Sequence, residues 1–311
     1  MSKKWAIGID IGGTNTDMGL VNEEGKCVAR KHLPTGEFDD EELYADAMAQ
    51  CIRELFVENG ITDMEEVQGI GIGAPNGNFY TGCMEHAPNL RFRGSVDLKH
   101  LMERRLGLTT TVTNDANAAA YGEKIYGGAK EMNDFILVTL GTGVGSGIVC
   151  HGQLLYGHDG FAGELGHTIL HVDGRSCSCG RCGCLETYAS IRGIIQTYNE
   201  LSEQVGAKKM EGNNCKAITE LADKGNPIAM ATWERTARHL GIALANAVAF
   251  SSPEAIFLMG GPSQAGHWLY DPLRVYFEEN LLSNYKGKVQ VLPSQLPAND
   301  AAILGAAALT W

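Results

Sequence analysis

The sequence predicts an α/β protein with mixed sheets, arranged as two lobes around a cleft. Segments with strand-like patterns alternate with helical ones along the 311 residues, and several strands are joined as hairpins by short turns. A meander of strand, glycine turn, strand, tight turn and strand also occurs twice, roughly 130 residues apart. This repeat indicates a duplicated architecture with two similar lobes.

The first copy of the meander opens the chain. Residues 5–10 alternate as a short strand that ends in I-G-G-T-N-T, and further strands are expected at 17–21 and 26–32 around the turn N-E-E-G. Residues 41–59 then form an amphipathic helical pattern that Gly60 ends. The next expected elements are a buried strand at 67–74, a helix at 96–106, a strand at 109–113 and a helix at 116–126.

The second copy begins with a strand at 134–140 that ends in G-T-G-V-G-S-G, followed by I-V-C, the turn H-G-Q and L-L-Y-G. The last expected elements are an alanine-rich helix at 227–251, strands at 255–259 and 288–292, and a helix that Asn299 and Asp300 cap and that reaches Trp311. No linker separates the lobes, which we expect at 1–118 plus 299–311 (the smaller) and at 119–298.

Composition and charge restrict the class of protein. The formal charge of −12, from 25 basic and 37 acidic residues, argues against a nucleic-acid-binding surface. No apolar run reaches the ~18 residues of a membrane helix, and the N-terminus has no signal-peptide pattern, so we expect a cytoplasmic protein without a membrane partner. Five of the nine cysteines are scattered singly, which predicts free thiols in a reducing compartment.

The two glycine turns, at 10–16 and 141–147, are candidate phosphate clamps. Glycines let backbone N–H groups approach a phosphate, and the interleaved Thr and Ser hydroxyls add donors. Neither turn matches a P-loop, and a strand rather than a helix follows each, which excludes the dinucleotide fingerprint. Plain hairpin turns are the alternative interpretation. Because they occupy matching positions in the two copies, we favour the phosphate clamp.

Three polar residues follow strands and are candidates for chemistry. Asp10 ends an apolar strand, where a carboxylate needs a cation or several donors; Mg²⁺ would suit it, and its own turn amides are the alternative. Asn114 and Asp115 stand between a strand and a helix. They could only cap the helix, or Asp115 could be a general base while Asn114 orients the same substrate.

The segment 164–186 carries the most specific signal, a C-x-C-x4-C spacing with His167 upstream. Cys177, Cys179, Cys184 and His167 make a plausible Cys3His zinc site. Cys182 or His171 could replace one ligand, and four reduced loop cysteines without an ion are the alternative. Four protein ligands leave no open position, so the zinc is expected to be structural.

Taken together, these motifs resemble the ROK family. They are D-I-G-G-T-N-T at 10–16, N-D-A-N-A-A at 114–119, G-T-G-V-G-S-G at 141–147, E-L-G-H at 164–167 and C-S-C-G-R-C-G-C-L-E at 177–186. The resemblance implies the actin-like (hexokinase-like, ribonuclease H-like) ATPase fold. It also implies an ATP-dependent hexose kinase, most similar to the bacterial glucokinases of the family, that uses Mg²⁺ and a structural zinc ion.

The resemblance further implies a role for each matching residue. Asp115 would be the general base that takes the proton of the sugar 6-hydroxyl. The remaining sugar-binding residues would be Asn89, Asn114, Glu164, His167 and Glu186. The ATP side would be formed by Asp10, Gly12, Gly13 and Thr14, by Gly141, Thr142 and Gly143, and by Gly260 and Gly261 near the adenosine. Zinc would bind His167, Cys177, Cys179 and Cys184. Two departures are Asn76, which replaces the glycine of the family's G-x-P-G turn, and the additional Cys182.

The sequence motifs are compatible with three functions. A glucokinase is the leading hypothesis, and a kinase for N-acetylmannosamine, N-acetylglucosamine, fructose or allose is the second. The third is a sugar-responsive repressor, the family's other branch, which carries an N-terminal winged helix. Only nine residues precede Asp10, so we expect no such helix and no nucleic-acid partner. The resemblance also suggests a homodimer.

Overall fold

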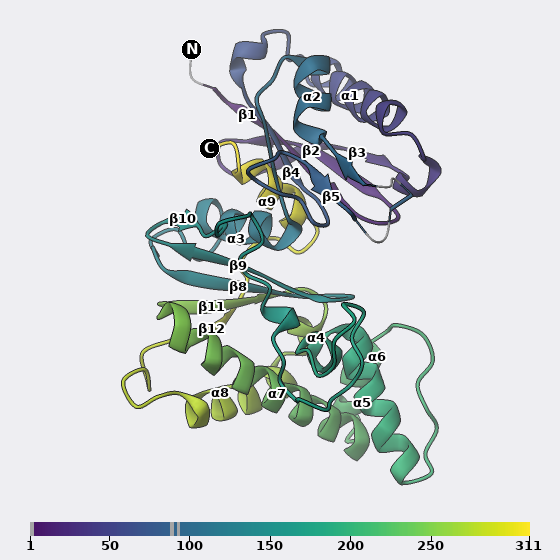
Figure 1. Ribbon diagram of the computed structural model, residues 1–311, viewed down its shortest axis with the longest axis vertical. Coiled ribbons are helices and arrows are strands. Elements are labelled where there is room, and N and C mark those ends of the chain that lie inside the picture. Colours follow the sequence, from purple (N-terminus) through teal and green to yellow (C-terminus); the bar gives the residue numbers. More distant parts are fainter. Residues whose placement is uncertain (1–2, 88–89, 92–93) are drawn as a thin grey trace. The chain divides into compact units, whose positions relative to one another are not determined.

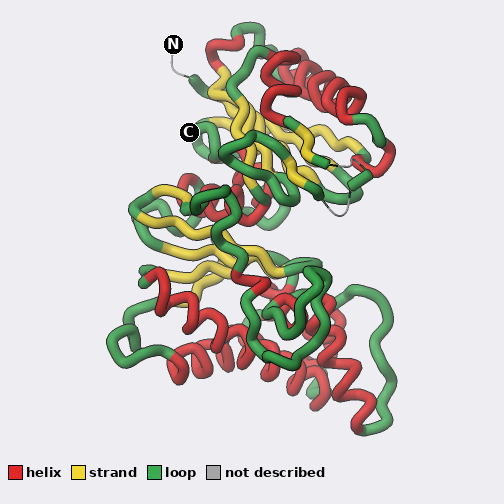
Figure 2. Tube along the Cα trace, viewed as in Figure 1, coloured by secondary structure: helices red, strands yellow, loops and turns green. Residues whose placement is uncertain are grey.

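The computed structural model describes residues 3–87, 90–91 and 94–311. Figure 1 shows the course of the chain, and Figure 2 shows where helices, strands and loops alternate along it. The chain forms two compact units. Unit 1 comprises residues 1–132, 147–162 and 295–311, and unit 2 comprises residues 133–146 and 163–294. The bounds expected for the two lobes, 1–118 plus 299–311 and 119–298, stay a prediction.

Unit 1 is built on a five-stranded sheet with the order β3-β2-β1-β4-β7. Its strands are β1 (Trp5–Ile11), β2 (Thr16–Asn22), β3 (Cys27–Leu33), β4 (Val67–Gly73) and β7 (Thr110–Thr113). The first three form the antiparallel meander, and β4 and β7 continue the sheet parallel to β1. β1 and β4 are buried along most of their length, which explains their nearly continuous apolar sequence.

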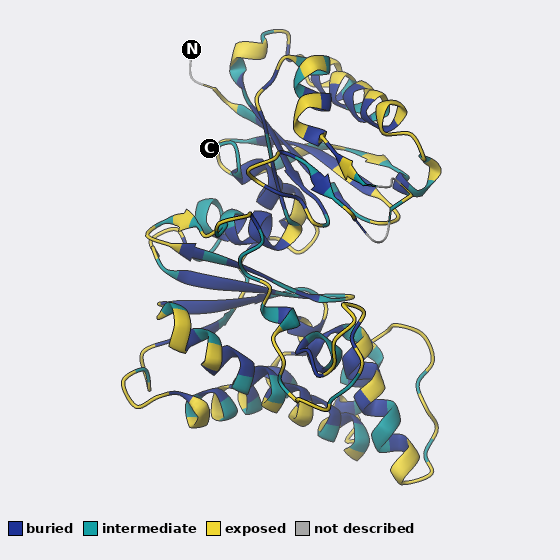
Figure 3. Ribbon diagram, in the orientation of Figure 1, coloured by how far each residue is buried: buried dark blue, intermediate teal, exposed yellow. Residues whose placement is uncertain are grey.

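Helices pack against this sheet. The helices α1 (Glu41–Glu58) and α2 (Leu98–Leu106) contribute Met48, Ile52 and Leu101 to a core that also contains Ile7 and Ile9 of β1. Figure 3 shows this buried interior beneath exposed outer faces of the helices. A two-stranded ribbon, β5 (Met84–Glu85) with β6 (Ser95–Val96), precedes α2.

The C-terminal helix α9 (Ala301–Ala308) packs closely on β1 and β4, and α3 (Asp115–Ile125) packs on α9. Glycine permits this approach: a Cβ on Gly71 would collide with the carbonyl oxygen of Ala306. The C-terminal helix is therefore part of the core that the first strands of the chain form.

The second sheet has the order β10-β9-β8-β11-β12. Its strands are β8 (Phe135–Leu140), β9 (Val144–Cys150), β10 (Gln153–Leu154), β11 (Ala255–Met259) and β12 (Gln290–Pro293). β11 pairs in parallel with β8 and with β12. This order has the same pattern as that of the first sheet, three successive strands followed by two later ones, so the predicted duplication is confirmed.

The helices of unit 2 are α4 (Glu186–Ala189), α5 (Ile191–Gln204), α6 (Lys216–Asp223), α7 (Pro227–Ser251) and α8 (His267–Asn280). Asn226 caps α7 by accepting hydrogen bonds from the N–H groups of Ile228 and Ala229, and α8 packs along α7 (Figure 1). None of the helices in the described part of the chain is long and apolar enough to cross a membrane.

Three elements differ from the sequence predictions by two or more residues at one end. The helix expected at 96–106 begins at Leu98, because Asp97 caps it by accepting the N–H of His100. The strand expected at 288–292 is β12, which begins two residues later and ends one residue later. The final helix ends at Ala308 rather than Trp311, and Asp300 is its N-cap residue without a side-chain capping bond.

Candidate active site and metal centre

In unit 1, the carboxyl ends of three neighbouring strands meet at one edge of the sheet. The register pairs Asp10 of β1 with Gly73 of β4, and Gly73 with Thr113 of β7. Asn114 and Asp115 follow Thr113 directly. Gly73 therefore lies between the two predicted carboxylates: a Cβ built on it would be 4.0 Å from Oδ1 of Asp10 and 3.6 Å from Cα of Asp115. The structure thus brings Asp10 and Asp115 together.

Asn114 caps a helix, whereas the side chain of Asp115 is exposed. Asn114 is the N-cap of α3, and its side-chain oxygen accepts the N–H of Asn117 at 2.7 Å. The capping interpretation is therefore correct for Asn114, whose Nδ2 group still offers two donors. Oδ1 of Asp115 accepts the neighbouring N–H of Ala116 at 2.9 Å. Its side chain reaches solvent, although the surrounding protein displaces enough water to raise its pKa.

Asp10 is held in an environment that disfavours its charge. Burial raises its pKa to about 7, and the negative charges of Asp115 and Asp17 act in the same direction. The glycine turn that follows is closed by a hydrogen bond from the N–H of Gly12 to the carbonyl of Asn15, 2.8 Å, while Gly13 and Thr14 are exposed. A cation bound here would relieve the repulsion between the carboxylates.

In unit 2, the second glycine turn follows β8 at the equivalent edge of its sheet. The N–H of Gly141 donates to the carbonyl of Gly143 at 2.9 Å, and the N–H of Ile191 at the start of α5 donates to the carbonyl of Gly141 at 2.9 Å. Gly260 follows β11 with a φ of 107° and packs on the carbonyl of Leu140, where a Cβ would not fit. The structure therefore brings Gly141, Gly143 and Gly260 to one place.

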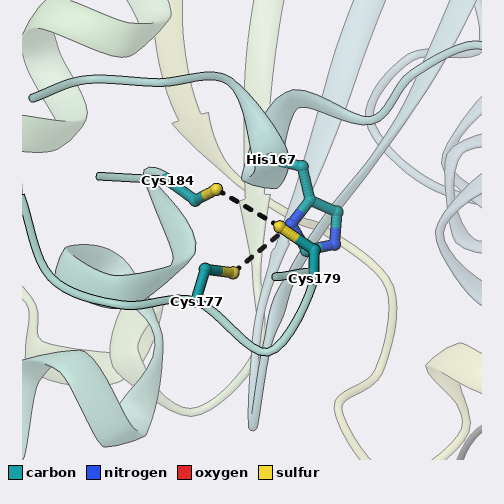
Figure 4. Close-up of side chains that lie close together, drawn as sticks. All are labelled: His167, Cys177, Cys179 and Cys184. Atoms are coloured by element: carbon teal, nitrogen blue, oxygen red, sulfur yellow. Dashed lines mark hydrogen bonds between the residues drawn. The ribbon is translucent and has the colours of Figure 1, made fainter. Parts of the chain in front are cut away.

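The four predicted zinc ligands form one cluster (Figure 4). The side-chain donor atoms of His167, Cys177, Cys179 and Cys184 all lie within 4.8 Å of one another. Sγ of Cys177 is 3.7 Å from Nδ1 of His167, and Sγ of Cys179 is 3.6 Å from Sγ of Cys184. A tetrahedral site with Zn–S bonds near 2.3 Å requires separations of roughly 3.8 Å between sulfurs, so this donor set suits zinc.

The loop that carries the cysteines is folded by short backbone bonds. The N–H of Cys177 donates to the carbonyl of Arg181 at 2.8 Å, and the N–H of Gly180 donates to the carbonyl of Cys177 at 3.1 Å. Hydrogen bonds from the backbone and guanidinium of Arg181 lower the pKa of Cys179 to about 6, which favours a thiolate inside the cluster. The sequence interpretation missed Arg181, although a cation beside these thiols is a readable signal.

Cys182 and His171 are the alternative zinc ligands that the sequence spacing allows. The backbone of Cys182 forms a β-bridge with Ser176, and its thiol is not part of the group of donor atoms. His171 packs instead against the rings of Tyr188 and His239, with centroids 4.9 and 5.1 Å away. Among the described residues, the structure therefore gathers the donor atoms of the Cys3His set, and neither Cys182 nor His171 is part of that group.

The predicted sugar-binding residues of unit 2 border this cluster. Nε2 of His167 faces Oε2 of Glu164 at 4.0 Å, on the opposite side of the ring from Cys177. Glu186 begins α4 just after Cys184, with Oε1 3.9 Å from Sγ of Cys177. Its other oxygen, Oε2, accepts the N–H of Val144 in the second glycine turn at 3.1 Å. This link between the cysteine-bearing loop and the glycine turn was not expected from the sequence.

Two further predicted features concern loops of unit 1. Asn89 lies outside the described residues. Asn76, in the place of the usual glycine, adopts a φ of 52°, so asparagine keeps the left-handed backbone there. The next glycine, Gly77, packs on the carbonyl of Thr113, just before Asn114.

Comparisons with known proteins show which proteins this chain is similar to. The glucokinase of Halalkalibacterium halodurans is 34% identical over 314 residues, which cover 98% of this chain and 94% of the relative. Among solved structures, a ROK family glucokinase from Streptomyces griseus in complex with glucose and AMPPNP superposes with a TM-score of 0.79 at 33% identity, covering 98% of both chains. The observed fold is therefore the two-lobed actin-like ATPase fold expected from the motifs.

A transcriptional regulator is also similar to this chain in structure. A ROK family transcriptional regulator, homologous to the MLC protein of E. coli, superposes with a TM-score of 0.87 at 27% identity, covering 98% of this chain and 77% of the regulator. The sequence model of the ROK family matches residues 6–311, almost the whole chain. The chain therefore belongs to the ROK family.

Proposed function

We propose that this protein is an ATP-dependent glucokinase, which transfers the γ-phosphoryl group of ATP to the 6-hydroxyl of D-glucose. The observation that carries the proposal is the similarity, over nearly the full length, to glucokinases that include one solved with glucose and AMPPNP. The exposed carboxylate of Asp115, beside Asp10 at the end of the sheet, is consistent with that chemistry.

Asp115 is the proposed general base. A carboxylate with a raised pKa is a stronger base than an ordinary aspartate, and its exposure lets a sugar hydroxyl approach it. Phosphoryl transfer depends mainly on positioning and on neutralising charge, so a single base that orients the hydroxyl in line with the phosphorus suffices. The Nδ2 group of Asn114 would donate a hydrogen bond to the same sugar.

The other sugar contacts would come from Asn89, Glu164, His167 and Glu186. Carboxylate and imidazole groups suit a pyranose, because each hydroxyl can donate to one and accept from another. His167 would serve twice: Nδ1 faces the sulfur cluster, which leaves Nε2 for a hydroxyl. N-acetylmannosamine, N-acetylglucosamine, fructose and allose are the alternative substrates to be compared with glucose.

ATP would be held by backbone amides of the two glycine turns. The residues proposed for its phosphates are Asp10, Gly12, Gly13 and Thr14 in unit 1 and Gly141, Thr142 and Gly143 in unit 2, with Gly260 and Gly261 towards the adenosine. Asp10 would hold Mg²⁺, which supplies neutralisation of phosphate charge when it is bound. His167, Cys177, Cys179 and Cys184 would hold zinc, whose contribution is to fix the loop.

The test is a coupled ADP-release assay with Mg-ATP across a panel of hexoses. Glucose should give the highest kcat/KM, and an Asp115→Asn variant should be the inactive control. Absence of turnover with every hexose would refute the proposal, and higher kcat/KM with another hexose would change the substrate. A homodimer and a cytoplasmic location stay predictions, and light scattering checks the first.

A further inference from the structure

We propose that Arg175 is a positioning residue, which joins the zinc loop to the helix that carries Glu186 and so sets the affinity for glucose. Arg175 lies two residues before the first cysteine of the loop, and its side chain is only 13% exposed. The inference rests on the proposed glucokinase activity, because Glu186 is there a sugar ligand.

The backbone of Arg175 closes the neck of the loop. Its carbonyl accepts the N–H of Gly183 at 2.8 Å, and its N–H donates to the hydroxyl of Tyr188 on α4 at 3.0 Å. Gly183 has a φ of 76° and packs on the carbonyl of His171, so no larger residue fits there. The main chain at residue 175 is thus bonded both to the far side of the loop and to α4.

The guanidinium of Arg175 spans the junction between α4 and α5. Nη1 donates to the carbonyl oxygens of Thr187 and Gly193 at 2.7 and 3.0 Å. Nη2 donates to Oγ1 of Thr197 at 2.9 Å and to Oε2 of Glu200 at 2.6 Å. The group also lies over the ring of Tyr188, 4.8 Å from its centroid.

This set of contacts requires the planar fork of arginine. The carbonyl of Thr187, next to Glu186, lies at the end of a one-turn helix and has no partner within that helix. A lysine could supply the charge but not four directed hydrogen bonds. Without them, α4 would be free to shift relative to the loop, and the carboxylate of Glu186 would shift with it.

The test compares Arg175→Lys with Arg192→Lys, a matched change of an exposed arginine on α5. Five quantities are measured for each variant: zinc retention against a chelator, the KM for glucose, the KM for ATP, kcat and the Tm. Arg175→Lys should raise the KM for glucose about tenfold at saturating zinc and weaken zinc retention by a similar factor. Its KM for ATP and its kcat should change less than about twofold, and Arg192→Lys should behave as wild type.

A lowered Tm with unchanged zinc retention and unchanged KM for glucose would overturn the inference, since it would show a merely structural role. If Arg175→Lys does not fold, Thr197→Val and Glu200→Ala each remove one acceptor of the guanidinium. These variants are judged by zinc retention and by the KM for glucose. If the wild-type protein phosphorylates no glucose, the proposed function fails, and zinc retention alone decides whether Arg175 holds the loop.

Discussion

Gly143→Ala should weaken glucose binding, because the added methyl group would displace the carboxylate of Glu186. A Cβ on Gly143 would fall on Oε2 of Glu186 and lie 3.4 Å from its Cδ. The carboxylate is the flexible end of a side chain, so it would move away and give up the N–H of Val144, to which it is now bonded at 3.1 Å. Gly143 does not have a positive φ, so alanine is compatible with the backbone.

The expected loss of glucose affinity follows from the hydrogen bond between the N–H of Val144 and Glu186. A hydrogen bond to a charged group contributes about 1.5–3 kcal/mol, and every 1.4 kcal/mol is about tenfold in affinity. Glu186 is partly exposed, so the lower part of this range applies. We expect the Kd for glucose to rise roughly 10- to 30-fold.

The assay is glucose binding in the absence of nucleotide, by calorimetry, together with the Tm of each variant. Gly141→Ala is the matched control: it lies in the same turn, and a Cβ there would have no heavy atom within 4 Å. This control should keep wild-type glucose affinity, even if its KM for ATP changes. Wild-type glucose affinity in Gly143→Ala, or an equal loss in Gly141→Ala, would refute the reasoning.

Three further predictions concern the carboxylates and the metal. Asp115→Asn should fold and bind glucose but lose roughly 10²- to 10⁴-fold in kcat, the contribution of a general base; near-normal turnover would rule this assignment out. Because burial raises the pKa of Asp10 from 3.8 to about 7, the folded state holds this proton more tightly than the unfolded state. In magnesium-free buffer the free energy of unfolding should therefore fall by at most about 4 kcal/mol as pH rises from near 4 through 7, and Asp10→Asn should flatten a urea-unfolding series across this range. Removal of zinc by a chelator should raise the KM for glucose and lower the Tm together, both being restored by added zinc; unchanged glucose affinity in metal-free protein would contradict the role of His167.

Much of the fold could be read from local patterns. The two meanders are confirmed because alternating apolar residues and glycine turns are short-range signals, which tertiary packing did not override. The sequence spacing alone limited the candidate zinc ligands to a few residues. The conformation of the loop was needed to distinguish His171 and Cys182 from the residues whose donor atoms gather. His171 is only four residues from His167 and yet packs on aromatic rings.

Sequence alone determined the strand order along the chain, the Asn-Asp pair after a strand and the cluster of cysteines, since each depends on neighbours a few residues apart. Tertiary structure decided what these residues contact. Asp10 and Asp115 meet because β4 is paired between their strands, and Glu186 reaches Val144, 42 residues earlier in the chain. Arg175 acquires its role from α4 and α5. Such contacts depend on how separate elements pack, and that packing leaves no periodic signal in the sequence.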